Sequence, residues 1–266
     1  MTGLMLEHAN LPGCAPEVLI ELAGEAGFEA VSLRVQPFSR GEQVWLPQGA
    51  ADLSRLHDLL DRAGITIAAV DVFPLRPRLD VEKYRDAFAF TQQIGARHAL
   101  ATCATPEPDL LLQQAVECAN LAAEYDVSVN LEFTVMGSLP SLNDAVALLR
   151  KADHPNLGIT LDALHWARAG STIQDVREAG SLIRHVQLCD APLVNPWQSL
   201  MEEAMIGRLL PGEGELPLVE LLSAVPDGAL LGLEMCGDEI LPDQQTDWVE
   251  RMARTSRQVL NEAGRG

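Results

Sequence analysis

The chain has 266 residues, of which 47% are hydrophobic, and it carries a formal net charge of −19. A chain of this length can bury one large core, so we expect a single domain over residues 1–266. Its acidity argues against nucleic acid and anionic membranes as partners and suits a small, neutral or cationic ligand. The same acidity is also common in soluble cytosolic proteins, which is the alternative explanation.

The cysteines and the N-terminal segment bear on the cellular compartment. Five cysteines, at positions 14, 103, 118, 189 and 236, are scattered and contain no CxxC pair, which argues against a disulfide framework or a zinc knuckle. The segment MTGLMLEHAN lacks a basic region, and no window approaches the roughly eighteen apolar residues of a membrane span. We expect reduced thiols in a soluble, cytoplasmic protein.

Short apolar runs alternate with amphipathic patterns along the chain. Strands are predicted at residues 4–8, 29–35, 65–71, 96–102, 127–133, 157–162, 182–188 and 229–234. Helices are predicted at residues 16–27, 51–64, 81–95, 109–126, 141–152, 172–180, 216–225 and 247–264. A strand that recurs at intervals of roughly thirty residues is typical of strand–helix units. The sequence therefore predicts an α/β fold, a closed parallel (β/α)8 TIM barrel.

An insertion at about 190–213 separates the seventh strand from the next helix. It contains Trp197, Leu200, Met201, Met205 and Ile206, and this apolar content argues against disorder. We expect a short helix that covers the site, with simple structural decoration as the alternative.

Polar residues stand where the predicted strands end, and parallel strands deliver their ends to one rim of a barrel. In chain order they are His8, Arg34, Asp71, Thr102, Cys103, Glu132, Asp162, Gln187 and Glu234. Burying carboxylates there costs several kcal/mol unless a cation accompanies them. The last four residues form a hard, oxygen-rich set that suits one divalent ion, Mn²⁺ or Mg²⁺, better than zinc.

Each of these residues also has a simpler interpretation. A single acid at a strand end is more often a solvated loop carboxylate, and Gln187 alone would be read as a cap for backbone groups. Four successive strands that end in this way are the argument for a metal site. His165 follows Asp162 by three residues and would face the same side if a helical turn begins there, although a lone histidine is more often simply hydrogen-bonded. His185, two residues before Gln187, is expected to point into the barrel lumen and pack there.

Several motifs together resemble a known family. They are GFEAVSLRV, NLEF, ITLDALHWARAG, RHVQLCDAP, LLPGEGELPL and GLEM. The pattern is similar to the sugar phosphate isomerase/epimerase group of the xylose isomerase-like TIM-barrel superfamily. The resemblance spans nearly the whole chain. The hydroxypyruvate isomerase-like members have glutamine where Gln187 stands, so the chain is most similar to that subgroup. Other members include ketose 3-epimerases and 3-dehydroshikimate dehydratase.

The resemblance implies roles for particular residues. It makes Glu132, Asp162, Gln187 and Glu234 the metal ligands, and it gives His165 a contact with substrate oxygens. Arg208, in IGRLLPGEGE, is the candidate for the arginine that binds substrate, although the long insertion departs from the compact isomerases. His8 and Arg34 are further candidates for substrate binding at the rim.

The predicted site suits proton removal from a 2-hydroxyketone, because chelation stabilises the resulting enediolate. Glu132 and Glu234 are the predicted catalytic residues, since each has a second oxygen for proton transfer. If the proton returns to carbon, the protein is a metal-dependent isomerase or epimerase that acts on a small sugar or keto acid. Loss of a β-hydroxyl from the same intermediate gives the alternative, a dehydratase or lyase of the 3-dehydroshikimate dehydratase kind.

Other classes fit less well. An endonuclease of the same superfamily needs a basic DNA-binding face, which a net charge of −19 disfavours. The glycines of PGEGE alternate with acids, so no phosphate-binding loop follows the last strands. A barrel that binds sugar without turnover is the second alternative, but it would not need two carboxylate bases. The resemblance also implies a possible homo-oligomer.

Overall fold

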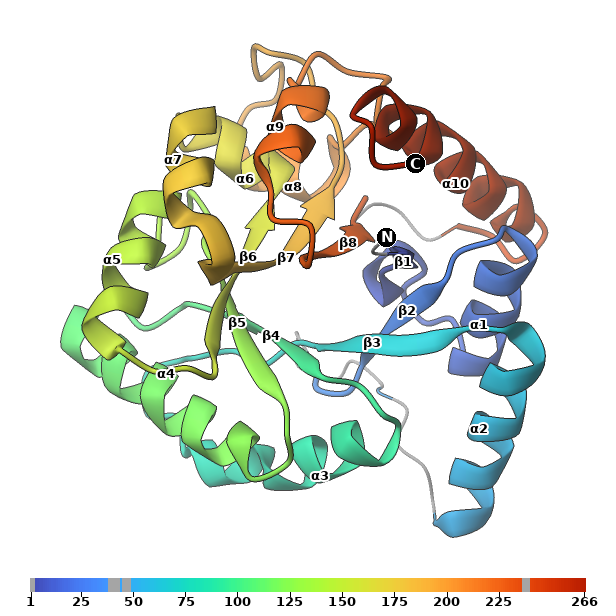
Figure 1. The fold of residues 1–266 in the computed structure, drawn as a ribbon, viewed down its shortest axis with the longest axis horizontal. Coiled ribbons are helices and arrows are strands. Elements are labelled where there is room, and N and C mark those ends of the chain that lie inside the picture. Colours follow the sequence, from blue (N-terminus) through green and yellow to red (C-terminus); the bar gives the residue numbers. More distant parts are fainter. Residues whose placement is uncertain (1–2, 38–43, 45–48, 236–239) are drawn as a thin grey trace.

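The computed structural model describes residues 3–37, 44, 49–235 and 240–266, which form a closed parallel barrel (Figure 1). Its strands follow one another in sequence order: β1 (Leu4–Leu6), β2 (Ala30–Arg34), β3 (Thr66–Asp71), β4 (His98–Thr102), β5 (Ser128–Glu132), β6 (Leu157–Asp162), β7 (Ile183–Leu188) and β8 (Leu230–Leu233). Parallel pairing of β1 with β8 closes the ring. The predicted TIM barrel is confirmed, with all eight strands in the predicted places.

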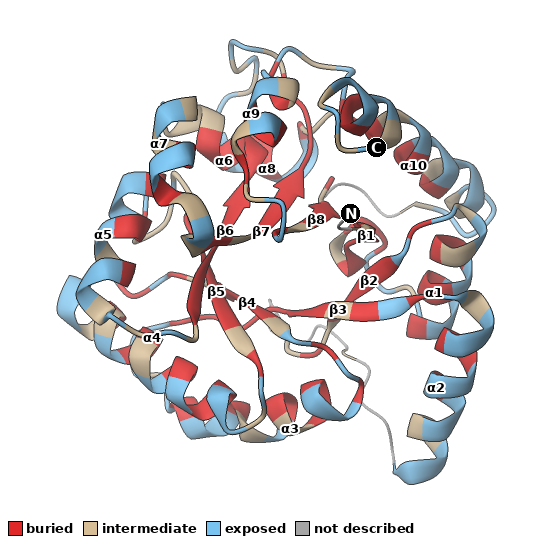
Figure 2. Cartoon of the chain, viewed as in Figure 1, coloured by how far each residue is buried: buried red, intermediate tan, exposed pale blue. Residues whose placement is uncertain are grey.

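Helices surround the barrel and present apolar faces to it, as the burial colours in Figure 2 show. They are α1 (Pro16–Glu25), α2 (Ala50–Ala63), α3 (Arg85–Gln93), α4 (Pro108–Ala123), α5 (Leu142–Ala152), α6 (Ala163–Arg168), α7 (Ile173–Ala179), α8 (Leu200–Ile206), α9 (Leu218–Ala224) and α10 (Gln245–Glu262). Three 3-10 turns complete the set: η1 (His8–Asn10), η2 (Val81–Tyr84) and η3 (Gly180–Leu182). Among the described residues, none of the helices has both the length and the apolar composition that a membrane crossing requires.

Local sequence explains where several helices begin and end. Ser141 caps α5 by accepting a hydrogen bond from the Asp144 amide, and Thr172 and Asp175 form a reciprocal capping box at α7. Gly64 ends α2 with a φ of 67°, a conformation that glycine adopts without strain.

In two predicted elements, a 3-10 turn replaces part of the expected strand or helix. The strand predicted at residues 4–8 ends at Leu6, so His8 lies in the η1 turn rather than on the strand. The helix predicted at residues 81–95 opens as the η2 turn before α3 begins. Both differences lie at element ends, where turn geometry and tertiary contacts decide the boundary.

Alternation along the last four strands separates an apolar outer layer from a polar lumen, because successive side chains of a strand point to opposite faces. The outward positions join the main core: Val129, Leu131, Ile159, Leu161, Val186, Leu188, Leu231 and Leu233. The inward positions are Asn130 and Glu132, Thr160 and Asp162, His185 and Gln187, and Gly232 and Glu234. The strand pattern alone therefore carries the four predicted ligands to one end of the lumen.

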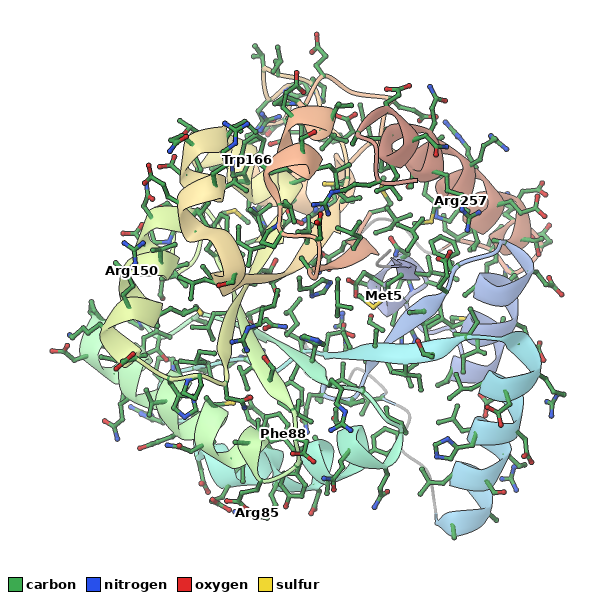
Figure 3. The ribbon with its side chains drawn as sticks, in the orientation of Figure 1. Met5, Arg85, Phe88, Arg150, Trp166 and Arg257 are labelled. Atoms are coloured by element: carbon green, nitrogen blue, oxygen red, sulfur yellow. The ribbon has the colours of Figure 1, made fainter. Side chains whose placement is uncertain are left out.

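The floor of the lumen is apolar and the layer above it is polar. Met5, at the centre of the barrel in Figure 3, forms a separate cluster with Ala30 and Ala69. Two residues further along the chain, the Glu7 carboxylate meets the His185 ring, with Oε1 and Nε2 2.7 Å apart. Both side chains are buried, so His185 packs inside the barrel as expected.

Gly232 makes room for this buried pair. A Cβ at that position would lie 2.1 Å from Glu7 Oε1 and 3.1 Å from His185 Nε2. Gly232→Ala should therefore lower the free energy of unfolding by about 1–3 kcal/mol, the usual effect of overpacking a filled interior. The midpoint of urea denaturation measures this change.

Gly228→Ala is the matched control, because a Cβ there would meet no atom within 4 Å. Its midpoint should correspond to a change below about 0.5 kcal/mol. Equal midpoints for the two variants would show that the lumen tolerates a methyl group beside Glu7.

Candidate metal centre

Three carboxylates converge at the carboxyl end of the barrel. Glu132 ends β5, Asp162 ends β6, and Glu234 directly follows β8. One oxygen atom from each lies within 4.8 Å of the others. Asp162 is fully buried and Glu132 nearly so, while Glu234 keeps a small exposed area. The topology has thus brought together acids that are separated by up to a hundred residues in the sequence.

Gln187 supplies a fourth oxygen. It lies beside Asp162 in the register of β6 and β7, and its side chain is buried. Its Oε1 atom is buried without a hydrogen-bond partner. A buried acceptor left in this state costs about 1–3 kcal/mol, which coordination of a cation would recover. The donor set of carboxylate and amide oxygens fits a hard divalent ion.

The electrostatics of the metal-free site favour protons on two of the acids. Burial, followed by repulsion from Glu234 and Asp162, raises the pKa of Glu132 well above its ordinary value. Burial also raises the pKa of Glu234 to about 7, with Arg208 opposing the rise and Asp162 adding to it. A bound cation would replace these protons, so the ion and the acids stabilise each other.

Arg208 is the cation that the structure places at the site. Its Nη1 donates to Asp162 Oδ2 at 2.5 Å, and its Nη2 lies 4.0 Å from Glu234 Oε2. Burial raises the pKa of Asp162, but Arg208 and His165 outweigh that effect and hold it below the ordinary value. The guanidinium therefore compensates the charge of Asp162, and Glu132 and Glu234 are left for protons or a metal ion to compensate.

His165 lies beside the acids because Asp162 caps the helix that carries it. Asp162 Oδ1 accepts a hydrogen bond from the His165 amide at 2.9 Å, which starts α6 directly after β6. The ring is buried, its Nδ1 has no hydrogen-bond partner, and it lines the cavity above the acids. Burial lowers the pKa of His165, so the neutral ring is available to contact a ligand.

His8 and Arg34 line the same cavity. Arg34 Nε donates to Asp71 Oδ2 at 2.7 Å, so its charge is paired at the rim. His8 Nδ1 accepts from the Arg34 amide, and its Nε2 lies 3.0 Å from the Cys14 carbonyl. Thr102 and Cys103 also reach this cavity.

The cavity over the acids has a volume of 940 Å³. Its outer wall is largely apolar and includes Pro12, Pro16, Met136, Met201 and Met205. Met201 and Met205 belong to α8, so the insertion contains a short helix that covers the site, as predicted. The four cysteines of the described residues, Cys14, Cys103, Cys118 and Cys189, are free thiols, and Cys236 lies outside those residues.

Sequence reasoning missed Glu7, which lies in the lumen near the acids. Its charge raises the pKa of both Glu132 and Glu234. The signal was present, because strict alternation from Met5 places residue 7, not residue 8, on the inward face. His8, the residue predicted from the sequence, lies one position later, in the η1 turn.

The fold is that of a TIM barrel, and comparison with known proteins gives its family. A family model described as xylose isomerase-like TIM barrel matches residues 20–261, and the chain belongs to this family.

Two curated relatives share the name 3-dehydroshikimate dehydratase. The Pseudomonas aeruginosa protein is 28% identical over 230 residues, and the Pseudomonas putida protein is 27% identical over 233 residues. Each match covers 81% of this chain and 34% of the relative, so the chain spans about a third of their length.

Solved structures share the fold. The probable 3-DHS dehydratase AsbF from Bacillus anthracis is 16% identical with a TM-score of 0.78, covering 97% of this chain and 99% of that one. D-psicose 3-epimerase from Clostridium cellulolyticum is 16% identical with a TM-score of 0.74, covering 98% and 99% of the two chains. The IOLI protein, solved with a bound zinc atom, is 18% identical with a TM-score of 0.76, covering 99% and 98%.

Replacing Gln187 with Met tests the fourth ligand, because Met has a similar shape but lacks the amide oxygen. The variant should bind Mn²⁺ about tenfold more weakly or worse, while the metal-free protein keeps or gains stability since an unsatisfied acceptor is removed. Melting temperature as a function of Mn²⁺ concentration reports both quantities. Gln113→Met, on the exposed face of α4, is the control and should leave the Mn²⁺ response unchanged. A variant that responds to Mn²⁺ like the wild type would remove Gln187 from the ligand set.

Proposed function

We propose that this chain is a divalent-metal-dependent enzyme that removes the proton next to a carbonyl group of a small polyhydroxylated substrate. The supporting observation is the convergence of Glu132, Asp162 and Glu234 within 4.8 Å, beside the unpaired oxygen of Gln187. These four residues would hold the ion, with Mn²⁺ or Mg²⁺ as our expectation. When bound, the ion stabilises the negative charge that develops on the substrate oxygens.

Glu132 and Glu234 are the proposed proton carriers. They come from β5 and from the end of β8, which approach the centre from different sides of the barrel, and both line the cavity. Each carboxylate has two oxygens, so one can hold the ion while the other accepts or returns a proton. The neutral His165 ring would hydrogen-bond a substrate oxygen, and Arg208 would orient an oxygen-rich or anionic group.

The two named relatives favour one outcome for the deprotonated substrate. Both are called 3-dehydroshikimate dehydratase, so we propose elimination of water from a cyclic hydroxyketone of that kind. A carboxylate of Glu132 or Glu234 takes the proton from the carbon next to the ketone, a double bond forms to the following carbon, and the hydroxyl on that carbon receives a proton from one of the two carboxyl groups and leaves as water. A wall that contains Pro12, Met136 and Met201 suits the flat ring that results.

Isomerisation or epimerisation is the second candidate, and it is the outcome that the sequence by itself favoured. The observation in its favour is the pair of carboxylates, one on each side, because one can remove a proton and the other can return it to the opposite face. The hydroxypyruvate isomerase-like assignment, which rests on glutamine at position 187, stays a prediction.

The decisive experiment supplies 3-dehydroshikimate to the Mn²⁺-loaded protein and follows ultraviolet absorbance, with a parallel incubation of candidate ketoses in deuterated water. A conjugated product supports the dehydratase. Deuterium incorporation without that product supports the isomerase. Bound metal with neither reaction would contradict both and favour a non-catalytic sugar-binding barrel.

Glu132→Gln and Glu234→Gln should each lower turnover by about a hundredfold or more, because an amide cannot carry the proton. At least one of them should still bind Mn²⁺, since an amide oxygen can replace a carboxylate oxygen as a ligand. Initial rates and Mn²⁺ titrations of each variant give the two quantities. Glu213→Gln, an exposed acid of the PGEGE loop, is the control. Wild-type rates in both site variants would refute the assignment of proton transfer.

His165→Ala should weaken substrate binding more than metal binding. Loss of one hydrogen bond to the substrate corresponds to a rise in KM of about tenfold, while Mn²⁺ affinity should change by less than about twofold. Steady-state kinetics and metal titration of the same preparation measure both. If the two affinities fall together, His165 would instead be a ligand of the ion.

A further inference from the structure

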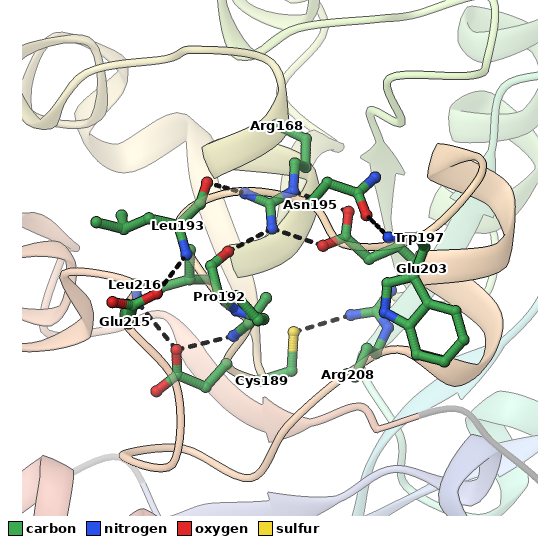
Figure 4. Close-up of polar contacts among 12 residues, drawn as sticks. Arg168, Cys189, Pro192, Leu193, Asn195, Trp197, Glu203, Arg208, Glu215 and Leu216 are labelled. Atoms are coloured by element: carbon green, nitrogen blue, oxygen red, sulfur yellow. Dashed lines mark hydrogen bonds and ion pairs between the residues drawn. The ribbon is translucent and has the colours of Figure 1, made fainter.

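A buried ion pair attaches the insertion to the barrel. Arg168, at the end of α6, donates from Nε to Glu203 Oε2 at 2.8 Å and from Nη2 to Glu203 Oε1 at 2.5 Å (Figure 4). Glu203 lies in the middle of α8 and is fully buried, and Arg168 is 9% exposed. A bidentate ion pair of this kind, largely removed from water, is a strong and directional interaction.

Arg168 also holds the start of the insertion. Its Nη2 donates to the Pro192 carbonyl at 2.6 Å, and its Nη1 donates to the Leu193 carbonyl at 3.1 Å. The end of the insertion is held separately, because the buried Asp190 accepts hydrogen bonds from the Gly212 and Leu216 amides. One arginine therefore fastens both α8 and the chain that leads into it, as Figure 4 shows.

The fastened helix is linked directly to the metal centre. The carbonyl of Ala204, the residue after Glu203, accepts a hydrogen bond from Arg208 Nε at 2.9 Å. The other end of the same guanidinium, Nη1, contacts Asp162 Oδ2 and the Cys189 sulfur. The position of α8 thus fixes the direction in which Arg208 points.

We propose that Glu203 is a positioning residue: through its ion pair with Arg168 it fixes α8 and thereby holds Arg208 against Asp162 and Glu234. The inference rests on the proposed metal centre for its consequence, which is that Arg208 occupies one oxygen of a ligand and limits how tightly the ion binds before substrate arrives. Glu203 contacts neither the ion nor the substrate. It acts only through Arg208.

Two measurements follow from this arrangement. If the pair is broken, α8 loosens and uncovers the Cys189 thiol, which is fully buried in the intact protein. Arg208 then leaves Asp162, so the Mn²⁺ affinity rises, because a positive charge no longer competes for the carboxylate. A role confined to overall stability would change neither quantity in a cooperatively folded protein.

The test compares Glu203→Gln with Glu213→Gln, which breaks the exposed pair with Arg251 at the end of the same segment. Labelling with a maleimide, read by mass spectrometry of the Cys189 peptide, should be at least about tenfold faster in Glu203→Gln only. Cys118, buried on α4, is the internal reference and should stay protected. Labelling of Cys118 would indicate a variant that has unfolded.

Arg168→Lys is the second variant. Lysine keeps the positive charge but cannot donate two parallel hydrogen bonds to the Glu203 carboxylate, so Cys189 should again be labelled faster than in the wild type.

A double-mutant cycle on Mn²⁺ affinity tests the link to Arg208. Glu203→Gln and Arg208→Gln should each raise the affinity by about three- to tenfold, and the double variant should match Arg208→Gln alone. Additive effects, or a Cys189 that stays protected in both Glu203→Gln and Arg168→Lys, would overturn the proposal. A wild-type protein that binds no Mn²⁺ would contradict the metal centre, while the labelling experiment would still decide whether Glu203 holds the insertion.

Discussion

The mutual repulsion of three buried carboxylates at the end of the barrel is the constraint that the surrounding residues must satisfy. Glu132, Asp162 and Glu234 lie within 4.8 Å of one another and are largely removed from water. Such a cluster is stable only if protons, a guanidinium or a metal ion compensate its charge. The raised pKa of two of the acids and the contact of Arg208 with the third represent the first two forms of compensation. The unpaired oxygen of Gln187 points to the third.

The barrel places apolar residues on its outer face and polar residues in its lumen. Apolar residues at the outward positions of the strands bind the helices, and this packing supplies the stability that allows polar groups inside. In the lumen, Met5 closes the floor, the pair of Glu7 and His185 forms a polar layer, and the acids form the rim. Each layer fits because Gly232 has no side chain, which leaves space for Glu7.

The insertion adds a wall and a cation to the cavity over this centre. A TIM barrel places its active groups on the loops that follow the strands, so an extended loop after β7 can add both a wall and a cation. Here α8 supplies methionines to the cavity, and the chain that follows it supplies Arg208. The buried ion pair of Arg168 and Glu203 attaches this added segment to α6. For the proposed function, this wall would limit the orientations that the substrate can take in the cavity.

The sequence by itself determined the strands, the barrel and the convergence of Glu132, Asp162, Gln187 and Glu234, because alternation and parallel topology send strand ends to one rim. It also indicated a helix within the insertion. Tertiary structure alone decided that Glu7 meets His185 in the lumen, that Arg34 is paired with Asp71, and that Glu203 is buried against Arg168. These outcomes depend on contacts between residues far apart in the chain. A hydrophobic pattern of period two or 3.6 predicts which face of a strand or helix a residue occupies, but it does not identify the residue that it contacts on that face.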